Sequence, residues 1–277
     1  MTYRQMLEKG KILLKDSKAE EYDNDAFELL SFVTGISRTD FLLKSNEELP
    51  EEYEKKYNEL IRKRSTRYPL QYITGEAWFY GRKFYVDENV LIPRFDTENL
   101  VEWIIKEEKN SKRFLDMCTG SGCIAVTIKE ELKGAEAFAS DLSGEALKVA
   151  SKNADIIGSH IDFIQSDLYE NITGRYDFIV SNPPYIESKV IDTLMPEVKE
   201  YEPYMALDGG EDGLFFYREI IKNAPKFLNP GGRLYFEIGY DQAESVGKLL
   251  DESGFKDIEV RKDLAGNDRC IRGILGE

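Results

Sequence analysis

The sequence predicts an α/β protein in which a small helical domain and a β-hairpin precede a mostly parallel, seven-stranded sheet with one antiparallel strand. Residues 1–75 repeat apolar side chains at helical spacing, and from residue 113 onward strand-like and helix-like runs alternate. Such alternation favours a parallel sheet with right-handed crossovers. We expect residues 1–75 to form the helical domain, residues 76–93 the hairpin connector and residues 94–277 the α/β domain.

The helical domain is predicted from periodicity and from signals at helix ends. Apolar positions between Tyr3 and Leu14, and again between Ala26 and Val33, fall on one helical face. Gly35 follows the second run, where a left-handed cap is expected. A third helix is expected to begin near Pro50, because the first turn of a helix has no use for the N–H that proline lacks.

The connector and the sheet are predicted from short apolar runs. Aromatic runs on both sides of Gly81-Arg82 are typical of a hairpin. The seven expected strands are residues 113–116, 135–140, 161–165, 176–180, 233–238, 257–261 and 270–275. The last two have no helix between them, which makes one strand antiparallel. Helices are expected at residues 124–132, 146–154, 214–227 and 242–250, and a turn at Pro230-Gly231-Gly232.

Charge and composition exclude several classes of protein. The formal net charge is −15, and residues 1–75 hold 13 basic and 14 acidic side chains, so the α/β part carries nearly all of it. An acidic surface disfavours direct nucleic-acid binding. No apolar run is long enough for a membrane span, and three cysteines make no disulfide framework, so we expect a cytoplasmic protein. A monomer is expected as well, although nothing in the sequence fixes the oligomeric state. A basic cluster, Arg62, Lys63, Arg64 and Arg67, is either a solvated helix end or a surface for an acidic partner.

Polar residues follow four of the expected strands: Asp116, Asp141, Asp167 and Asn182. Ligands of such sheets bind at the carboxyl ends of the strands. The glycines that follow Asp116 let backbone approach a ligand closely. A carboxylate at Asp141 can accept a ribose diol, and Asp167 can hold an adenine amino group. This pattern predicts an adenosine-bearing ligand, either NAD or S-adenosylmethionine.

The stretch Asn182-Pro183-Pro184-Tyr185 suits chemistry on a planar nitrogen. An amide or aromatic amino nitrogen is a poor nucleophile, so both of its N–H groups must be held while it faces a methyl sulfonium. Asn182 and the Pro183 backbone can supply carbonyl oxygens, the prolines stiffen the turn, and Tyr185 can lie against the planar group. The rate then comes from positioning and electrostatics.

Wider strings give the sequence a family resemblance. Residues 69–75, PLQYITG, and residues 90–98, VLIPRFDTE, accompany the Asn182–Tyr185 motif, as do shorter strings from Tyr201 to Leu214 and the run at residues 263–269. Together they resemble the release factor glutamine methyltransferase family, which has a Rossmann-like class I methyltransferase domain. In two positions the chain departs from the family: Phe95 replaces a usual proline and Cys118 a usual glycine.

The resemblance implies a function and a set of site residues. Members methylate the glutamine of the Gly-Gly-Gln motif in peptide chain release factors, using S-adenosylmethionine, and the helical domain helps to dock the factor. Asn182, Pro183 and Tyr185 would be catalytic, and Asn182 to Tyr185 would bind the substrate amide. The cofactor would be bound by Asp116, Cys118, Thr119, Gly120, Ser121, Gly122, Asp141, Asp167, Leu168 and Asn182, with no metal.

Three alternatives compete with this function. A DNA adenine-N6 methyltransferase uses the same kind of motif on a flipped base, but it needs a basic groove that this acidic chain lacks. A non-catalytic adapter of release factor or ribosome would not need Asn182 to Tyr185. A nicotinamide-dependent oxidoreductase is disfavoured because Cys123-Ile124-Ala125 stands where the third glycine of its fingerprint belongs. Arg94 is expected to pair with an acidic residue near the cofactor, or with the substrate.

Overall fold

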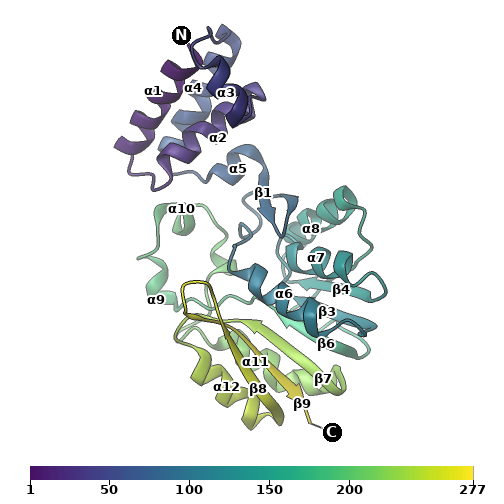
Figure 1. The fold of residues 1–277 in the computed structure, drawn as a ribbon. Helices are drawn as coiled ribbons and strands as arrows, with labels where there is room; N and C mark the ends of the chain where they lie inside the picture. The colour runs from purple at the N-terminus through teal and green to yellow at the C-terminus, as the bar shows by residue number, and fades with distance from the viewer. Residues whose placement is uncertain (277) are drawn as a thin grey trace. The chain divides into compact units, whose positions relative to one another are not determined.

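The computed structural model describes residues 1–276 and divides into two compact units. Unit 1 consists of Met1–Glu76 and Met195–Tyr201, and unit 2 of Ala77–Leu194 and Glu202–Glu277. Figure 1 shows their elements as a ribbon. Within residues 1–276, the model contains no helix with the length and apolar character needed to cross a membrane.

Unit 1 is helical. Its helices are α1 (Tyr3–Asp16), α2 (Tyr22–Thr34), α3 (Arg38–Lys44), α4 (Glu51–Ser65), α5 (Leu70–Thr74) and α10 (Pro196–Lys199). A capping box between Thr2 and Gln5 begins α1, and Gly35 ends α2 in the expected left-handed conformation. The packing of α1 on α4 is close: a Cβ added at Gly10 would lie 2.1 Å from the hydroxyl oxygen of Tyr57. Glycine is therefore required where these helices meet.

Two of the four residues in the basic cluster at the end of α4, Arg64 and Arg67, form ion pairs within unit 1, whereas Arg62 and Lys63 are exposed. Arg64 is buried, and its guanidinium donates to Asp25 Oδ2 at 2.7 Å and to Glu197 Oε1 at 3.0 Å. Arg67 pairs with the same Glu197 carboxylate. These ion pairs bind α10, which is distant in sequence, to the α4 end of the helical unit. Arg64 and Arg67 therefore form neither a solvated helix end nor an open surface for an acidic partner.

Unit 2 contains a hairpin and a seven-stranded sheet. The hairpin pairs β1 (Glu76–Phe79) with β2 (Arg82–Tyr85). The sheet has the order β5-β4-β3-β6-β7-β9-β8, and β9 runs antiparallel to both of its neighbours. Its strands are β3 (Arg113–Met117), β4 (Glu136–Asp141), β5 (Asp162–Gln165), β6 (Tyr176–Ser181), β7 (Leu228–Glu237), β8 (Phe255–Lys262) and β9 (Asp268–Leu275). The predicted fold class is confirmed.

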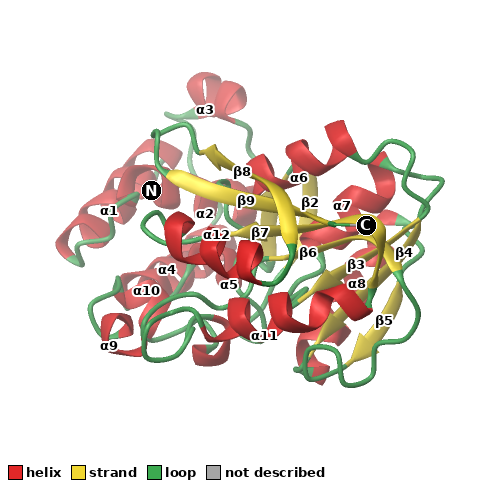
Figure 2. Cartoon of the chain, turned by 90° about the horizontal axis from the view of Figure 1, so that it is seen from below, coloured by secondary structure: helices red, strands yellow, loops and turns green. Residues whose placement is uncertain are grey.

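Helices cover both faces of the sheet, and each face has its own apolar core. One core takes residues from α6 (Thr97–Glu107), α7 (Cys123–Glu131) and α8 (Gly144–Ile157), and the other from α11 (Phe215–Asn223) and α12 (Ala243–Glu252). In Figure 2 the strands run between α6 and α7 on one side and α11 on the other. The remaining short elements are α9 (Ser188–Ile191), η1 (Tyr204–Ala206) and η2 (Ala224–Lys226).

The structure differs from the expected elements at several places. The expected turn at Pro230-Gly231-Gly232 lies inside β7, where the pairing with β6 jumps from Leu228 to Arg233 and leaves a bulge. The helix expected at residues 214–227 ends as the short 3₁₀ turn η2. Helix α6 was not expected at all, although Leu100, Trp103 and Ile104 form its buried face.

The loop between β3 and α7 has a left-handed backbone at three positions. Cys118, Gly120 and Gly122 have φ values of 60°, 53° and 78°. At Gly122 an added Cβ would lie 3.0 Å from the Cβ of Ala150, so the loop also passes close to α8. Cys118 thus occupies a conformation that favours glycine, the residue the resembled family usually has there.

Replacing Arg64 with methionine should loosen unit 1, because the carboxylate of Asp25 would stay buried without its partner. Removing one member of a buried pair typically costs about 3–5 kcal/mol. Peptides from α2 and α4 should then exchange amide hydrogen for deuterium much faster. Arg62→Met is the matched control on the exposed side of α4 and should exchange as the wild type. Equal protection in both variants would contradict the structural role of Arg64.

Replacing Cys118 with valine should destabilise unit 2 by roughly 1–3 kcal/mol, because a β-branched residue is strained at positive φ. Cys118→Gly should change stability by less than about 1 kcal/mol, since relief of strain offsets the extra freedom of the unfolded chain. Both tryptophans, Trp78 and Trp103, lie in unit 2, so their fluorescence in urea reports this unit alone. A valine variant as stable as the wild type would rule out strain at this position.

Candidate active site

A cavity opens in unit 2 at the carboxyl ends of β3, β4, β5 and β6. This is where a parallel sheet of this topology is expected to bind ligands. The expected cofactor-binding residues that line the cavity are Cys118, Thr119, Gly120, Ser121, Asp141, Asp167, Leu168 and Asn182. Pro184 also lines it, whereas Asp116, Gly122, Pro183 and Tyr185 are not among the lining residues. The structure thus brings together residues from four separate strand ends.

Asp116 stabilises the β3–α7 loop by accepting hydrogen bonds from the loop and from α7. It is fully buried, and its Oδ2 accepts hydrogen bonds from the Thr119 hydroxyl at 2.6 Å and the Ala125 N–H at 3.2 Å. Burial raises the pKa of Asp116 to about 7, against the effect of these two hydrogen bonds. The side chain therefore shapes the loop that would hold a ligand and does not itself face the cavity.

Asp141 joins the loop to the end of β4. Its two carboxylate oxygens accept from the N–H groups of Gly120 and Ser143, each at 2.9 Å. Burial raises the pKa of Asp141, and these backbone hydrogen bonds oppose the rise. Each carboxylate oxygen can accept a second hydrogen bond, so the cavity side of Asp141 can still receive a diol.

Asp167 and Leu168 are held at the cavity by a turn after β5. The buried hydroxyl of Ser166 donates to the Leu168 carbonyl at 2.9 Å and accepts from the Asn171 N–H at 2.9 Å. Leu168 has a φ of 46°, which turns the backbone sharply at this point. The turn places a carboxylate and an apolar side chain next to each other on the cavity wall, a suitable pair for a purine edge and face.

The charges around the cavity fit a ligand without phosphates. Asp141 and Asp167 are acidic, and within residues 1–276 the one Lys or Arg side chain in the lining is Arg94. Arg94 is paired already: its Nη2 donates to both carboxylate oxygens of Glu202, at 2.8 and 2.7 Å. Burial raises the pKa of Glu202 to about 7, and Arg94 opposes this. A positively charged adenosine derivative matches this cavity better than a dinucleotide does.

Arg94 was expected to pair either with an acidic residue near the cofactor or with the substrate, and in this structure it pairs with an acidic residue. Glu202 lies in the same unit, and its side chain is 1% exposed. Arg94 is therefore paired with an acidic residue at the cavity wall. Phe95, the neighbouring departure from the resembled family, is 68% exposed and leaves the cavity lining unchanged.

The motif after β6 is held at both ends. The Ser181 hydroxyl donates to the Met117 carbonyl at 2.7 Å, which fixes the strand end next to the β3 loop. Asn182 Nδ2 donates to Thr97 Oγ1 at 3.4 Å, and Asn182 lines the cavity. The Tyr185 hydroxyl donates to Glu237 Oε1 at 3.2 Å, and the Tyr185 carbonyl accepts from Gln242 at 3.0 Å. Burial raises the pKa of Tyr185, as does the negative charge of Glu237, so its phenol stays neutral.

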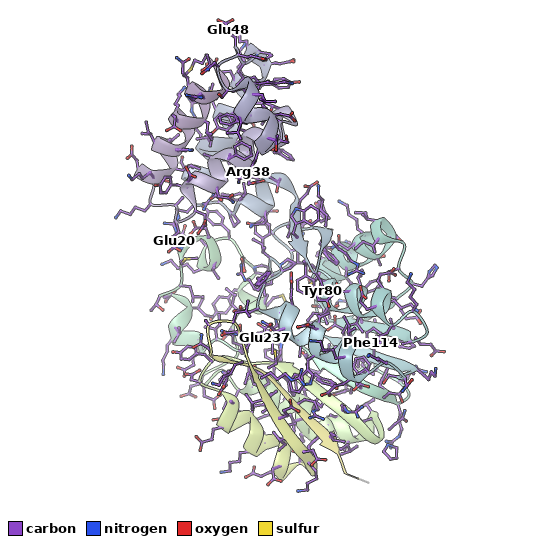
Figure 3. The ribbon with its side chains drawn as sticks, viewed as in Figure 1. Glu20, Arg38, Glu48, Tyr80, Phe114 and Glu237 are labelled. Carbon is purple, nitrogen blue, oxygen red and sulfur yellow. The ribbon has the colours of Figure 1, made fainter. Side chains whose placement is uncertain are left out.

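Three residues that support the site were not predicted from the sequence: Thr97, Glu237 and Gln242. Glu237 is 1% exposed at the last position of β7, and Figure 3 labels it at this edge of the sheet. A glutamate at the end of the apolar run Leu234-Tyr235-Phe236 was the available signal, because carboxylates are rarely buried without partners. The signal does not tell which partners the carboxylate has.

Comparison with known proteins supports the same interpretation of the whole chain. A family model described as the PrmC N-terminal domain matches residues 5–75, and one described as a methyltransferase small domain matches residues 94–198. Among solved structures, a methyltransferase from Pyrococcus furiosus has a TM-score of 0.55 at 16% identity, covering 72% of this chain and 91% of that one. That likeness shows the fold.

Two curated relatives span the full length of the chain. The release factor glutamine methyltransferase of Clostridium botulinum is 42% identical, with 98% of this chain and 99% of the relative covered. The enzyme of the same description from Clostridium acetobutylicum is 40% identical, with 100% and 99% covered. Identity at this level extends over both units, including the helical one. The chain therefore belongs to the release factor glutamine methyltransferase family.

Proposed function

We propose that this enzyme methylates the side-chain amide nitrogen of the glutamine in the Gly-Gly-Gln motif of peptide chain release factors. The observation that carries the proposal is the place of Asn182, which lines the adenosine-type cavity while its Nδ2 is held by Thr97. Its carbonyl oxygen is then free to accept an N–H from a planar amide. S-adenosylmethionine is the methyl donor of this enzyme class.

The reaction needs two acceptors at the substrate nitrogen. When bound, S-adenosylmethionine supplies an electrophilic methyl group on a sulfonium. Asn182 Oδ1 would accept one N–H of the glutamine amide and the Pro183 carbonyl the other, so that the nitrogen lone pair points at the methyl group. Both oxygens stabilise the positive charge that develops on nitrogen. Transfer of the methyl group would leave S-adenosylhomocysteine, and the proton lost from the methylated nitrogen would pass to water.

The other motif residues would keep this arrangement rigid. Pro183 and Pro184 restrict the backbone and remove N–H groups that could compete for the acceptors. Tyr185 is held through its hydroxyl and its carbonyl, so its ring has a fixed place beside the amide. Positioning of this kind can supply a large part of the rate without a general base.

Unit 1 is the proposed docking domain for the release factor. Leu42 and Leu43 on α3 are 77% and 80% exposed, and Phe32 on α2 is 47% exposed. Exposed apolar side chains of this size are typical of protein-contact surfaces. The release factor would be bound in the cytoplasm, where translation ends.

The competing functions fit the site less well. A DNA adenine-N6 methyltransferase needs cations for the DNA backbone, whereas Asp141 and Asp167 flank the cavity and Arg94 is paired with Glu202. An adapter without turnover would gain nothing from the hydrogen bonds that hold Asn182 and Tyr185.

The direct test is methylation of a purified release factor with labelled S-adenosylmethionine. We expect one added methyl group on the Gly-Gly-Gln peptide, located by mass spectrometry. A release factor with alanine in place of that glutamine is the control and should remain unlabelled. Label on both factors, or on DNA and neither factor, would overturn the proposal.

Replacing Asn182 with alanine should raise the activation barrier by about 2 kcal/mol or more, the scale of a lost polar group at a developing charge. The affinity for S-adenosylhomocysteine, measured by calorimetry, should fall less than the turnover rate, because Asp141 and Asp167 are unchanged. A turnover rate close to the wild type would refute the role given to Asn182.

A further inference from the structure

Glu237 joins three parts of unit 2 that carry the candidate active site. It ends β7, and within hydrogen-bonding distance lie the first residue of α6 and the motif that follows β6. Thr97 Oγ1 lies 2.5 Å from Glu237 Oε2, and the Tyr185 hydroxyl lies 3.2 Å from Oε1. Thr97 and Glu237 are 2% and 1% exposed, so water does not compete for these contacts. Both carboxylate oxygens are thus used by the protein itself.

The direction of these hydrogen bonds follows from which groups carry a proton that they can donate. A carboxylate only accepts, so Thr97 must give its single hydroxyl proton to Glu237. The oxygen of Thr97 can then only accept from Asn182, 3.4 Å away, and the Asn182 atom that donates must be Nδ2. An asparagine amide has an oxygen on its other branch. The carboxylate therefore determines which end of the Asn182 amide is available at the cavity.

Two hydroxyl donors and one cation face the carboxylate. Burial raises the pKa of Glu237, and the hydrogen bonds from Thr97 and Tyr185 and the positive charge of Arg269 oppose this rise without cancelling it. Arg269 itself is held in place, since its Nη1 donates to the Ile238 carbonyl at 3.3 Å and its Nη2 pairs with Asp263 at 3.3 Å. Asp96, 3.5 Å from Arg269, is the further acidic group facing this cation.

We infer that Thr97 and Glu237 are positioning residues that turn Asn182 Oδ1 toward the substrate nitrogen and hold the Tyr185 ring through the second carboxylate oxygen. The inference rests on the proposed function and extends it from the motif to two residues outside the motif. Glu237 does not line the cavity, whereas Thr97 does; the Thr97 hydroxyl is occupied by Glu237 and Asn182, so both residues act through Asn182. If these hydrogen bonds were reversed, Asn182 would present its NH₂ group to an N–H of the substrate amide. That contact would oppose binding of the amide in the reactive orientation.

Paired variants separate this role from a merely structural one. Thr97→Val keeps the shape of the side chain and removes the hydroxyl, whereas Thr97→Ser keeps the hydroxyl. Thr127→Val is the matched control: Thr127 is fully buried in α7, outside the cavity lining, and within residues 1–276 its hydroxyl has no hydrogen-bond partner. Thermal unfolding shows that each variant is folded before it is assayed.

Steady-state kinetics on the release factor are the first measurement. We expect Thr97→Val to lower kcat by roughly tenfold to a hundredfold, the effect of losing one to two hydrogen bonds at the substrate nitrogen. The KM for the cofactor should stay within about threefold of the wild-type value. Thr97→Ser should recover most of kcat, and Thr127→Val should match the wild type. Glu237→Gln should lower kcat at least as much as Thr97→Val, because its NH₂ can donate to Thr97 and reverse the hydrogen-bond direction.

A binding measurement without turnover tests the same orientation. Sinefungin resembles S-adenosylmethionine but carries a protonated amine where the transferable methyl group would be. S-adenosylhomocysteine has neither the amine nor the methyl group. An ammonium should bind an Asn182 oxygen and be repelled by an NH₂ group. We expect Thr97→Val and Glu237→Gln to weaken sinefungin by about tenfold relative to S-adenosylhomocysteine, the scale of one charged hydrogen bond. Thr97→Ser and Thr127→Val should keep the wild-type ratio.

The outcomes separate this inference from the proposed function. A wild type that leaves the release factor unlabelled refutes the proposed function, and the sinefungin ratio still decides the orientation of Asn182. A Thr97→Val variant that is folded, with wild-type kcat on the factor and a wild-type sinefungin ratio, overturns the inference while the function stands. Equal losses in the valine and serine variants would also overturn it, since packing and not the hydroxyl would then be responsible.

Discussion

The carboxylate of Glu237 is buried at the end of β7 and accepts hydrogen bonds from α6 and from the motif after β6. A buried carboxylate is unfavourable unless its oxygens are hydrogen-bonded, so its partners are tightly constrained. Here the constraint acts on Tyr185 directly and on Asn182 through Thr97. The orientation of Asn182 and Tyr185 therefore depends on a charge that does not line the cavity.

A second constraint is that strong charges are already paired before any ligand binds. Arg94 is held by Glu202 at the cavity wall, and Asp141 is held by backbone N–H groups of the loop it supports. The cavity is left with acceptor atoms and apolar surface, and no free cation is available in its described lining to attract phosphates. Such a cavity suits a sulfonium that carries adenosine, and it also explains why an acidic protein can contain the site without a basic groove.

The alternation of strands and helices was enough to predict the sheet, and the strand ends were enough to predict Asp141, Asp167 and Asn182 at one cavity. The prediction missed contacts that depend on distant residues: Thr97 and Glu237 are 140 positions apart, and nothing local to either indicates the other. Helix α3 was missed because none of its residues is buried, so it has no apolar periodicity to detect. The turn expected at Pro230-Gly231-Gly232 is a bulge inside β7, because the strand pairs with β6 both before and after these residues.

The fold and the cofactor loop do not by themselves select a protein glutamine, since distant methyltransferases share the sheet at low identity. Selection must then involve residues outside the shared sheet and cofactor loop. The chain leaves the motif at Tyr185 and, after residues 186–194, enters α10, which packs as part of unit 1 through Glu197 and the buried Arg64. A substrate bound by unit 1 would thus act on a unit that is connected, through a short stretch of chain, to the motif proposed to hold its glutamine. Binding energy gained far from the reacting nitrogen can in this way be used to orient it.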